Sequence, residues 1–136
     1  MNAAIKPPFT EQTALAAVKA SQDAWNKRVA EEVPAAYAAD TAWRYREAFL
    51  AGRDNIVPFL RERWPIQQEY RLRKHLWSFT GNRISVRFES EWRHKDTQQW
   101  YRTHGNEHWQ FDADGLITHL DLSANDIPIK EGERRL

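Results

Sequence analysis

Two histidines and a glutamate lie within five residues of one another in the stretch HGNEH, residues 104–108. The stretch has the form H-x-x-E-H, a pattern of zinc peptidases in which two helical histidines hold the metal and the glutamate acts as the base. On a helix, residues four positions apart lie about 5–6 Å from each other on one face. The hypothesis of a metallohydrolase therefore depends on whether this segment is helical.

The flanking residues favour a strand. Aromatic residues and threonine surround the motif, and Gly105 and Asn106 would weaken a helix at its centre. On a strand, His104 and His108 share a face but lie about 13 Å apart, too far to share one zinc ion with bonds of about 2.0–2.1 Å. Glu107 points to the opposite face. We therefore expect no metal site, with both histidines on the outer face as polar residues.

The face that contains Glu107 is mostly apolar and is where chemistry is expected. Burying a charged carboxyl there is costly, so Glu107 favours the protonated form unless a partner compensates. A buried protonated carboxyl can act as a general acid or donate a hydrogen bond to an oxyanion. In the structural alternative, Glu107 pairs with an arginine or a tyrosine hydroxyl. The few polar residues expected on this inward face are Glu107, Ser90, Thr103 and Tyr101.

Period-two alternation predicts the strands that position this face. A short strand is expected at 41–46, and a hairpin turns at Gly81-Asn82 between two long strands. A third long strand contains the HGNEH motif, and a fourth follows the turn at 112–115. Helical patterns are expected at about 11–29, capped by Thr10, at about 31–38 and at 53–64. The fold class is α+β, with a curved antiparallel sheet.

Composition restricts the class of protein. The 136 residues predict one domain, with residues 1–9 as a flexible arm and 125–136 as a polar tail that wraps the surface or a partner subunit. The net charge of +1 gives no reason to expect nucleic acid or membrane surfaces as partners. Acidic or apolar residues interrupt the arginines at 61, 63, 71 and 73, although a basic patch is an alternative.

The absence of cysteine excludes disulfides and thiol catalysis and fits a reducing compartment. There is no apolar run of about 20 residues, and the first residues lack the apolar region of a signal peptide. We therefore expect a cytoplasmic protein. Seven tryptophans must line either a core or a cavity.

Three stretches in this order resemble the nuclear transport factor 2-like superfamily: YAADTAWRYR at 37–46, AGRDNIVPFL at 51–60 and NEHWQFDADGLI at 106–117. The resemblance covers about residues 11–124 and is greatest for SnoaL-like proteins of unknown function. It implies a cone of bent sheet closed by about three helices, a pocket inside, and a homodimer formed through the outer sheet face. Enzymes of the superfamily include ketosteroid isomerase, polyketide cyclases, scytalone dehydratase and limonene epoxide hydrolase; other members only bind partners or ligands.

The resemblance assigns some site residues and leaves one role unfilled. Glu107 corresponds to the protonated acid in the oxyanion hole of ketosteroid isomerase. Tyr45 stands at the position of that enzyme's aspartate base, and Ser21 near that of its oxyanion tyrosine. A neutral phenol is a poor base, so Tyr45 or Tyr101 is expected only to donate a hydrogen bond beside Glu107. His75 is the histidine that would replace the base if its side chain faced inward.

Two hypotheses of function follow. In the first, Glu107 and Tyr45 are the catalytic candidates of a small-molecule pocket that performs isomerisation, dehydration or cyclisation without a cofactor on an aromatic or polycyclic ligand. In the second, the protein is a non-catalytic homodimeric binding or interaction module whose cone is filled by its own tryptophans. The expected pocket residues are Trp25, Trp43, Phe59, Phe88, Ser90, Trp92, Tyr101, Thr103 and Trp109.

Overall fold

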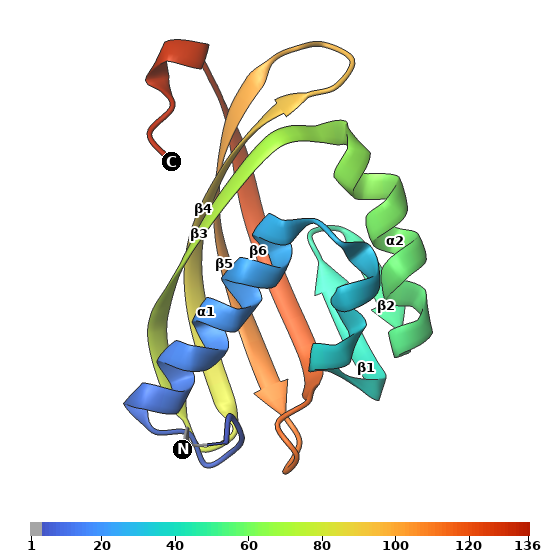
Figure 1. The fold of residues 1–136 in the computed structure, drawn as a ribbon, viewed down its shortest axis with the longest axis vertical. Helices are drawn as coiled ribbons and strands as arrows, with labels where there is room; N and C mark the ends of the chain where they lie inside the picture. The colour runs from blue at the N-terminus through green and yellow to red at the C-terminus, as the bar shows by residue number, and fades with distance from the viewer. Residues whose placement is uncertain (1–3) are drawn as a thin grey trace.

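The computed structural model describes residues 4–136 as an α+β fold in which one curved sheet is covered by helices (Figure 1). The six strands lie in the order β2-β1-β6-β5-β4-β3. Helix α1 crosses one face of the sheet, and α2 lies beside β1 and β2 (Figure 1). The elements are α1 Glu11–Lys27, β1 Tyr37–Tyr45, β2 Ala48–Ala51, α2 Ile56–Arg63, β3 Gln67–Thr80, β4 Arg83–His94, β5 Trp100–Phe111 and β6 Ile117–Ile129. Short 3-10 turns occupy Ala30–Glu32, Pro34–Ala36, Arg53–Asn55, Trp64–Ile66 and Glu131–Glu133.

Helix α1 begins where the sequence predicts. The Thr10 side chain accepts a hydrogen bond from the backbone of Thr13, and the Thr13 side chain accepts one from the backbone of Thr10. This reciprocal cap satisfies two N–H groups that a helix start leaves without partners. The helix ends at Arg28, which adopts the left-handed conformation with φ 60°. Its apolar side buries Ala14, Val18 and other residues against the sheet.

The prediction of a helix at about 31–38 is wrong. Two 3-10 turns take its place, and β1 already begins at Tyr37, well before the predicted residue 41. Tyr37 is 3% exposed and pairs with Ile117 of β6, so its burial in the sheet favours the extended chain. A further short strand, β2, pairs with the end of β1 and was not predicted. Helix α2 falls within the predicted range 53–64.

The four long strands form the predicted antiparallel succession β3-β4-β5-β6. Strand β1 runs parallel to β6, with Tyr45 next to Leu122. Leu122 in turn pairs with Glu107 of β5, and Glu107 pairs with Val86 of β4. Register therefore places Tyr45 and Glu107 on either side of one β6 residue.

Side chains of α1 bond to the outer edge of β3. The side-chain amide of Asn26 donates to the Leu72 carbonyl at 2.9 Å and accepts from the Leu72 N–H at 2.8 Å. Gln22 accepts from the backbone N–H of Lys74 at 2.8 Å. An edge strand otherwise presents unpaired backbone groups, so these bonds both protect the edge and fix the helix against it. They hold β3 with the Lys74 side chain directed inward.

Both predicted terminal segments need correction. Residues 1–3 lie outside the described part of the chain, but Phe9 is buried, packs on Phe111 with ring centroids 4.6 Å apart, and donates its N–H to the Gly81 carbonyl. The tail begins later than residue 125, because β6 continues to Ile129. Beyond it, the N–H groups of Arg135 and Leu136 donate to the buried carboxylate of Glu91.

Glu91 lies on the outer face of β4 and holds this C-terminal segment in place. Burial raises the pKa of Glu91, but the hydrogen bonds from Leu136, Arg135 and Arg102 outweigh it and bring the pKa below its usual value. A carboxylate that accepts several hydrogen bonds is stable in its charged form, so Glu91 keeps its bonds to Arg135 and Leu136 and fixes the C-terminal segment to the sheet.

Within residues 4–136, no helix has both the length and the apolar character that crossing a membrane requires.

Candidate functional site

Glu107 lies inside the curved sheet, as predicted, and is 3% exposed. Its Oε1 accepts hydrogen bonds from the Lys74 Nζ at 3.1 Å and from the indole Nε1 of Trp109 at 2.6 Å. Neither bond uses Oε2, and the residues that the structure describes donate no hydrogen bond to this atom. The carboxylate is therefore held firmly by one oxygen, while the other can accept from a ligand or water.

Lys74 is the partner that the sequence analysis missed. Its ammonium is as deeply buried as the Glu107 carboxylate, donates to the Ser21 Oγ at 2.8 Å, and lies over the rings of Trp25 and Trp109 at 5.5 and 5.2 Å. Burial lowers the pKa of Lys74, and the adjacent Glu107 only partly offsets this effect. Apolar residues in place of a buried ion pair often give a core of equal or greater stability. Ionisable groups with shifted pKa values beside a cavity are therefore candidates for function.

A visible signal pointed to Lys74. In the first long strand, Leu72, Lys74 and Leu76 alternate with Arg73 and His75, so the lysine shares the face of two leucines. His75, the histidine considered as a replacement base, is exposed on the outer face. Because lysine side chains are usually exposed, Lys74 was not predicted to face inward, although its position between Leu72 and Leu76 places it on their face of the strand.

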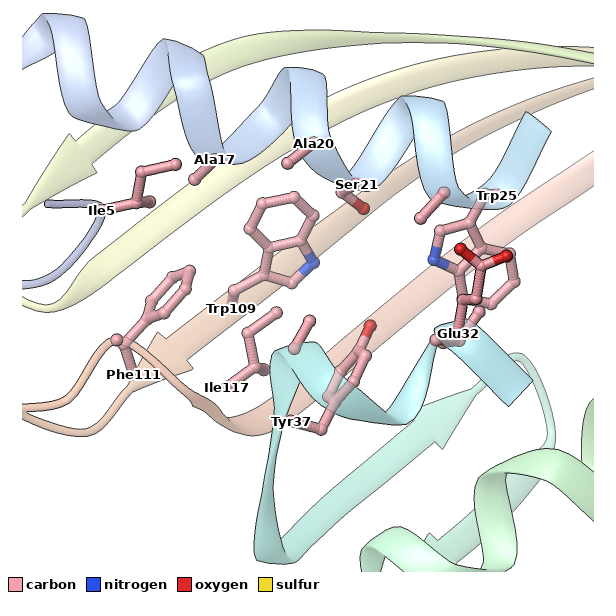
Figure 2. A pocket seen from close by; sticks show the side chains of 14 residues that line it. Ile5, Ala17, Ala20, Ser21, Trp25, Glu32, Tyr37, Trp109, Phe111 and Ile117 are labelled. Atoms are coloured by element: carbon pink, nitrogen blue, oxygen red, sulfur yellow. The ribbon is translucent and has the colours of Figure 1, made fainter. Parts of the chain in front are cut away.

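Two cavities lie beside the pair. The smaller one, about 20 Å³, is lined by Glu107, Lys74, Tyr45, Phe88 and neighbouring residues, and has room for about one water molecule. The larger one, about 140 Å³, lies between α1, the 3-10 turns and strands β5 and β6. Figure 2 shows Trp109 at its centre, with Ala17, Ala20 and Ser21 of α1 on one side and Tyr37 and Ile117 on the other.

The hydroxyl of Ser21 connects the larger cavity to the ion pair. Ser21 lines the cavity and accepts the hydrogen bond from Lys74, while Trp109 lines it and donates to Glu107. Trp25 lines both cavities. A single residue, Ser21 or Trp109, therefore lies between the ion pair and the larger cavity, an apolar space that a small ring would fill.

Tyr45 also lies near Glu107, and both line the smaller cavity. Its ring is nearly parallel to that of Trp25, with centroids 6.1 Å apart, and the guanidinium of Arg63 lies 4.8 Å from its centre. Burial raises the pKa of Tyr45, although the charges of Arg63 and Arg46 act in the opposite direction. The phenol is therefore a neutral hydrogen-bond donor and not a base.

The structure divides the predicted pocket residues into three groups. Trp25, Phe88 and Trp109 line the two cavities. Trp43 and Phe59 pack behind them against Tyr45, with ring centroids 6.5 and 5.4 Å away. These two residues support the site and line neither cavity.

The remaining four predicted residues, Ser90, Trp92, Tyr101 and Thr103, line neither cavity. Trp92 donates to Thr103 at 2.9 Å, Thr103 donates to Asp126 at 2.6 Å, and Asp126 forms a two-pronged ion pair with Arg46. Tyr101 stacks on Trp92. Trp92 and Thr103 therefore belong to a polar network that connects β4, β5 and β6.

The HGNEH segment is a strand, within β5, as predicted. His104 lies 3.3 Å from Glu89, and His108 lies 2.9 Å from the Ser85 hydroxyl; both pairs are on the outer face. No three metal-binding side chains come together anywhere in residues 4–136.

Gly105 faces inward with Glu107, and the ring of Phe88 occupies the space where another residue would have its Cβ.

Comparison with known structures places this fold among NTF2-like proteins. An NTF2-like protein of unknown function from Burkholderia pseudomallei is 20% identical, with a TM-score of 0.73 over 82% of this chain and 90% of that one. A putative polyketide cyclase from Xanthomonas campestris is 22% identical, with a TM-score of 0.69 over 84% and 91%. A steroid delta-isomerase from Pseudomonas aeruginosa is 20% identical, with a TM-score of 0.62 over 87% and 82%. Identities this low establish the fold alone.

Sequence comparison gives the family. No curated protein matches the chain. Residues 7–136 match the family model described as Protein of unknown function (DUF1348). Because this match spans nearly the whole sequence, the chain belongs to the DUF1348 family of proteins of unknown function, and its fold is that of the NTF2-like superfamily.

Proposed function

We propose that this protein binds a small apolar molecule beside the Lys74–Glu107 pair and that the pair transfers a proton on it without a cofactor. The observation that carries the proposal is the burial of both charges, 3.1 Å apart, in the lining of the smaller cavity and in contact with Ser21 and Trp109, which line the larger one. Burying an ion pair costs several kcal/mol per charge before the attraction is counted. Its position beside empty space supports a role in chemistry over a role in stability alone.

The two members of the pair have complementary roles in this proposal. The Oε2 atom of Glu107 would accept a proton from the ligand through one water molecule in the smaller cavity, while the ammonium of Lys74 stabilises the carboxylate beforehand. Tyr45, neutral and lining the same cavity, would donate a hydrogen bond to a developing oxyanion. This division of roles replaces the missing aspartate base at position 45. Isomerisation, dehydration and cyclisation all require this kind of acid–base chemistry.

Two structural neighbours support this reaction class. One is described as a putative polyketide cyclase and another as a steroid delta-isomerase. Such descriptions show what reactions the fold can accommodate elsewhere, while the residues that would perform them here are specific to this chain.

The cavity volume limits the size of the ligand. An apolar cavity of about 150 Å³ holds one benzene molecule. The 140 Å³ space between α1 and the sheet therefore matches a single ring. The polycyclic ligand expected from the number of aromatic residues would require the protein's own tryptophans to move. We therefore propose a monocyclic ligand.

Binding of toluene tests the pocket. We expect it to change the tryptophan fluorescence of the wild type, because Trp25 and Trp109 line the space. Ala17→Leu would fill the pocket from the buried side of α1 and weaken binding by about tenfold or more, a loss of about 1.4 kcal/mol. Ala16→Leu, on the same helix but outside the lining, is the matched control. Equal binding by all three proteins would refute this location.

A second candidate function is a non-catalytic homodimeric module. It is favoured by the small volume left beside Glu107, about 20 Å³, which shows that the centre of the fold is largely filled. In this alternative, Lys74 and Glu107 are a structural pair. A cytoplasmic location, consistent with the cysteine-free sequence, belongs to both candidates.

The outer sheet face supports a homodimer under either candidate. Trp77 is 66% exposed there and stacks with Arg87 at 4.8 Å, and Ile127 is 48% exposed. Exposed tryptophan and arginine are characteristic of protein interfaces. We expect light scattering to give twice the mass of one chain, and Trp77→Lys to reduce it to one. Leu15→Lys, which changes an exposed apolar residue of α1 on the other side of the sheet, is the control. A single-chain mass for the wild type would exclude this dimer.

A further inference from the structure

Arg28 is a cation without a counter-ion among residues 4–136. Its guanidinium carbon lies 3.5 Å from the centre of the Tyr70 ring and 4.8 Å from that of Trp64. The atoms Nε and Nη1 are buried and have no hydrogen-bond partner among the described residues. Only Nη2 donates, to the neutral side-chain oxygen of Gln67 at 3.2 Å. A buried guanidinium with free N–H groups is costly, and burial lowers the pKa of Arg28 to about 10.

The backbone around Arg28 is strained. Arg28 ends α1 in the left-handed conformation, with φ 60°, at a position where glycine or asparagine is preferred. Glu69, with φ 52°, is in the same conformation at a bulge near the start of β3. Both residues line one groove. Strained residues persist where the surrounding structure requires them, and they concentrate at ligand sites.

This groove lies between the end of α1 and the start of β3, with a volume of about 620 Å³. Its two carboxylates do not neutralise Arg28, since Glu31 pairs with Arg61 and Glu69 pairs with Arg93 at 3.0 Å. The local charge that remains is therefore the single positive charge of Arg28. A monoanion balances this charge, whereas the two acidic residues at the rim oppose a dianion.

We propose that Arg28 anchors a second binding site, for a small carboxylate, in the groove between α1 and β3. The planar guanidinium matches a carboxylate through two parallel N–H···O bonds. The oxygen of Gln67 now occupies one of these positions and would be displaced by the charged ligand. Trp64 and Pro65 line the same groove and would contact the apolar part of the molecule. Arg28 does not line the cavity between α1 and the sheet, so this site is independent of the proposed catalytic pocket.

The experiment compares benzoate, its neutral analogue benzamide and inorganic phosphate by calorimetry and by the ¹⁵Nε resonance of Arg28. We expect benzoate to bind the wild type and shift that resonance. Arg28→Gln is expected to weaken benzoate binding by about tenfold or more, because it removes the charge that strengthens both hydrogen bonds to the carboxylate. Arg28→Lys, which keeps the charge but not the two-pronged geometry, should bind at an intermediate level. Arg83→Gln, an exposed arginine at the start of β4, is the control.

Three results would overturn the proposal: benzamide binding as tightly as benzoate, phosphate binding more tightly than benzoate, or Arg28→Gln binding benzoate like the wild type. Ala17→Leu separates this site from the proposed function. It should leave benzoate binding unchanged while it weakens binding of toluene, so either site can fail while the other holds.

Discussion

Lys74→Met is expected to destabilise the protein by about 3–5 kcal/mol, because it leaves the Glu107 carboxylate buried without its charged partner. Methionine is similar in length to lysine and keeps the contacts with Trp25 and Trp109, so the loss reports mainly on the charge. Urea unfolding, monitored by circular dichroism, measures the change in the free energy of unfolding. The matched control is Lys19→Met, since Lys19 forms an exposed pair with Asp23 that contributes at most about 0.5 kcal/mol.

The double variant Lys74→Met/Glu107→Leu separates stability from function. Removing both charges together should restore most of the lost stability, because replacing a buried ion pair by apolar residues is often neutral or stabilising by about 1–4 kcal/mol. If the pair is catalytic, this stable double variant will bind the ring probe but perform no proton transfer. A double variant as unstable as Lys74→Met would show that the lysine acts through packing. Full activity in the double variant would exclude the acid–base role.

Gly105→Ala is expected to be the second most damaging change, at about 1–3 kcal/mol. A Cβ at this position would lie 2.2, 2.3 and 2.9 Å from three ring atoms of Phe88, so the ring must move. Phe88 is buried, and its ring lines the 20 Å³ cavity beside Glu107, toward which it can move. The substitution would therefore also close the cavity in which Oε2 of Glu107 is proposed to act.

A matched pair of variants tests this explanation by urea unfolding. Phe88→Leu in the Gly105→Ala background should recover part of the lost stability, because the shorter side chain makes room for the methyl group. Gly132→Ala is the control, since a Cβ there meets nothing within 4 Å and should change stability by less than about 0.5 kcal/mol. An unchanged unfolding midpoint for Gly105→Ala would contradict the close approach of Phe88.

The successful sequence predictions concern properties that are local in the chain. The alternation in residues 100–111 identifies a strand, and this alone places His104 and Glu107 on opposite faces of the sheet. The cap at Thr10 and the turn at residues 81–82 are local in the same way. The second helix failed because burial of Tyr37 against a distant strand overrode local propensity.

The composition of the site depended on contacts between distant segments. Glu107 was identified as the inward carboxyl, but its partner lies 33 positions away on β3 and is positioned by side chains of α1. The pocket residues predicted on β4 and β5 share a face with Glu107, yet several serve the polar network that includes Asp126. Parity establishes which face a residue occupies, but not how far along the sheet the cavity extends.

The sequence by itself determined that this chain folds as an α+β sheet protein, that HGNEH lies on a strand, and that Glu107 points inward. Each conclusion follows from side-chain periodicity, which a strand imposes on its own residues. Only the tertiary structure decided that Lys74 pairs with Glu107, that a cavity of about 140 Å³ lies between α1 and the sheet, and that Arg28 has no counter-ion within residues 4–136. Those facts arise where α1, β3 and β5 meet, and the distances between side chains there are set by packing across the fold and not by the order of residues along it.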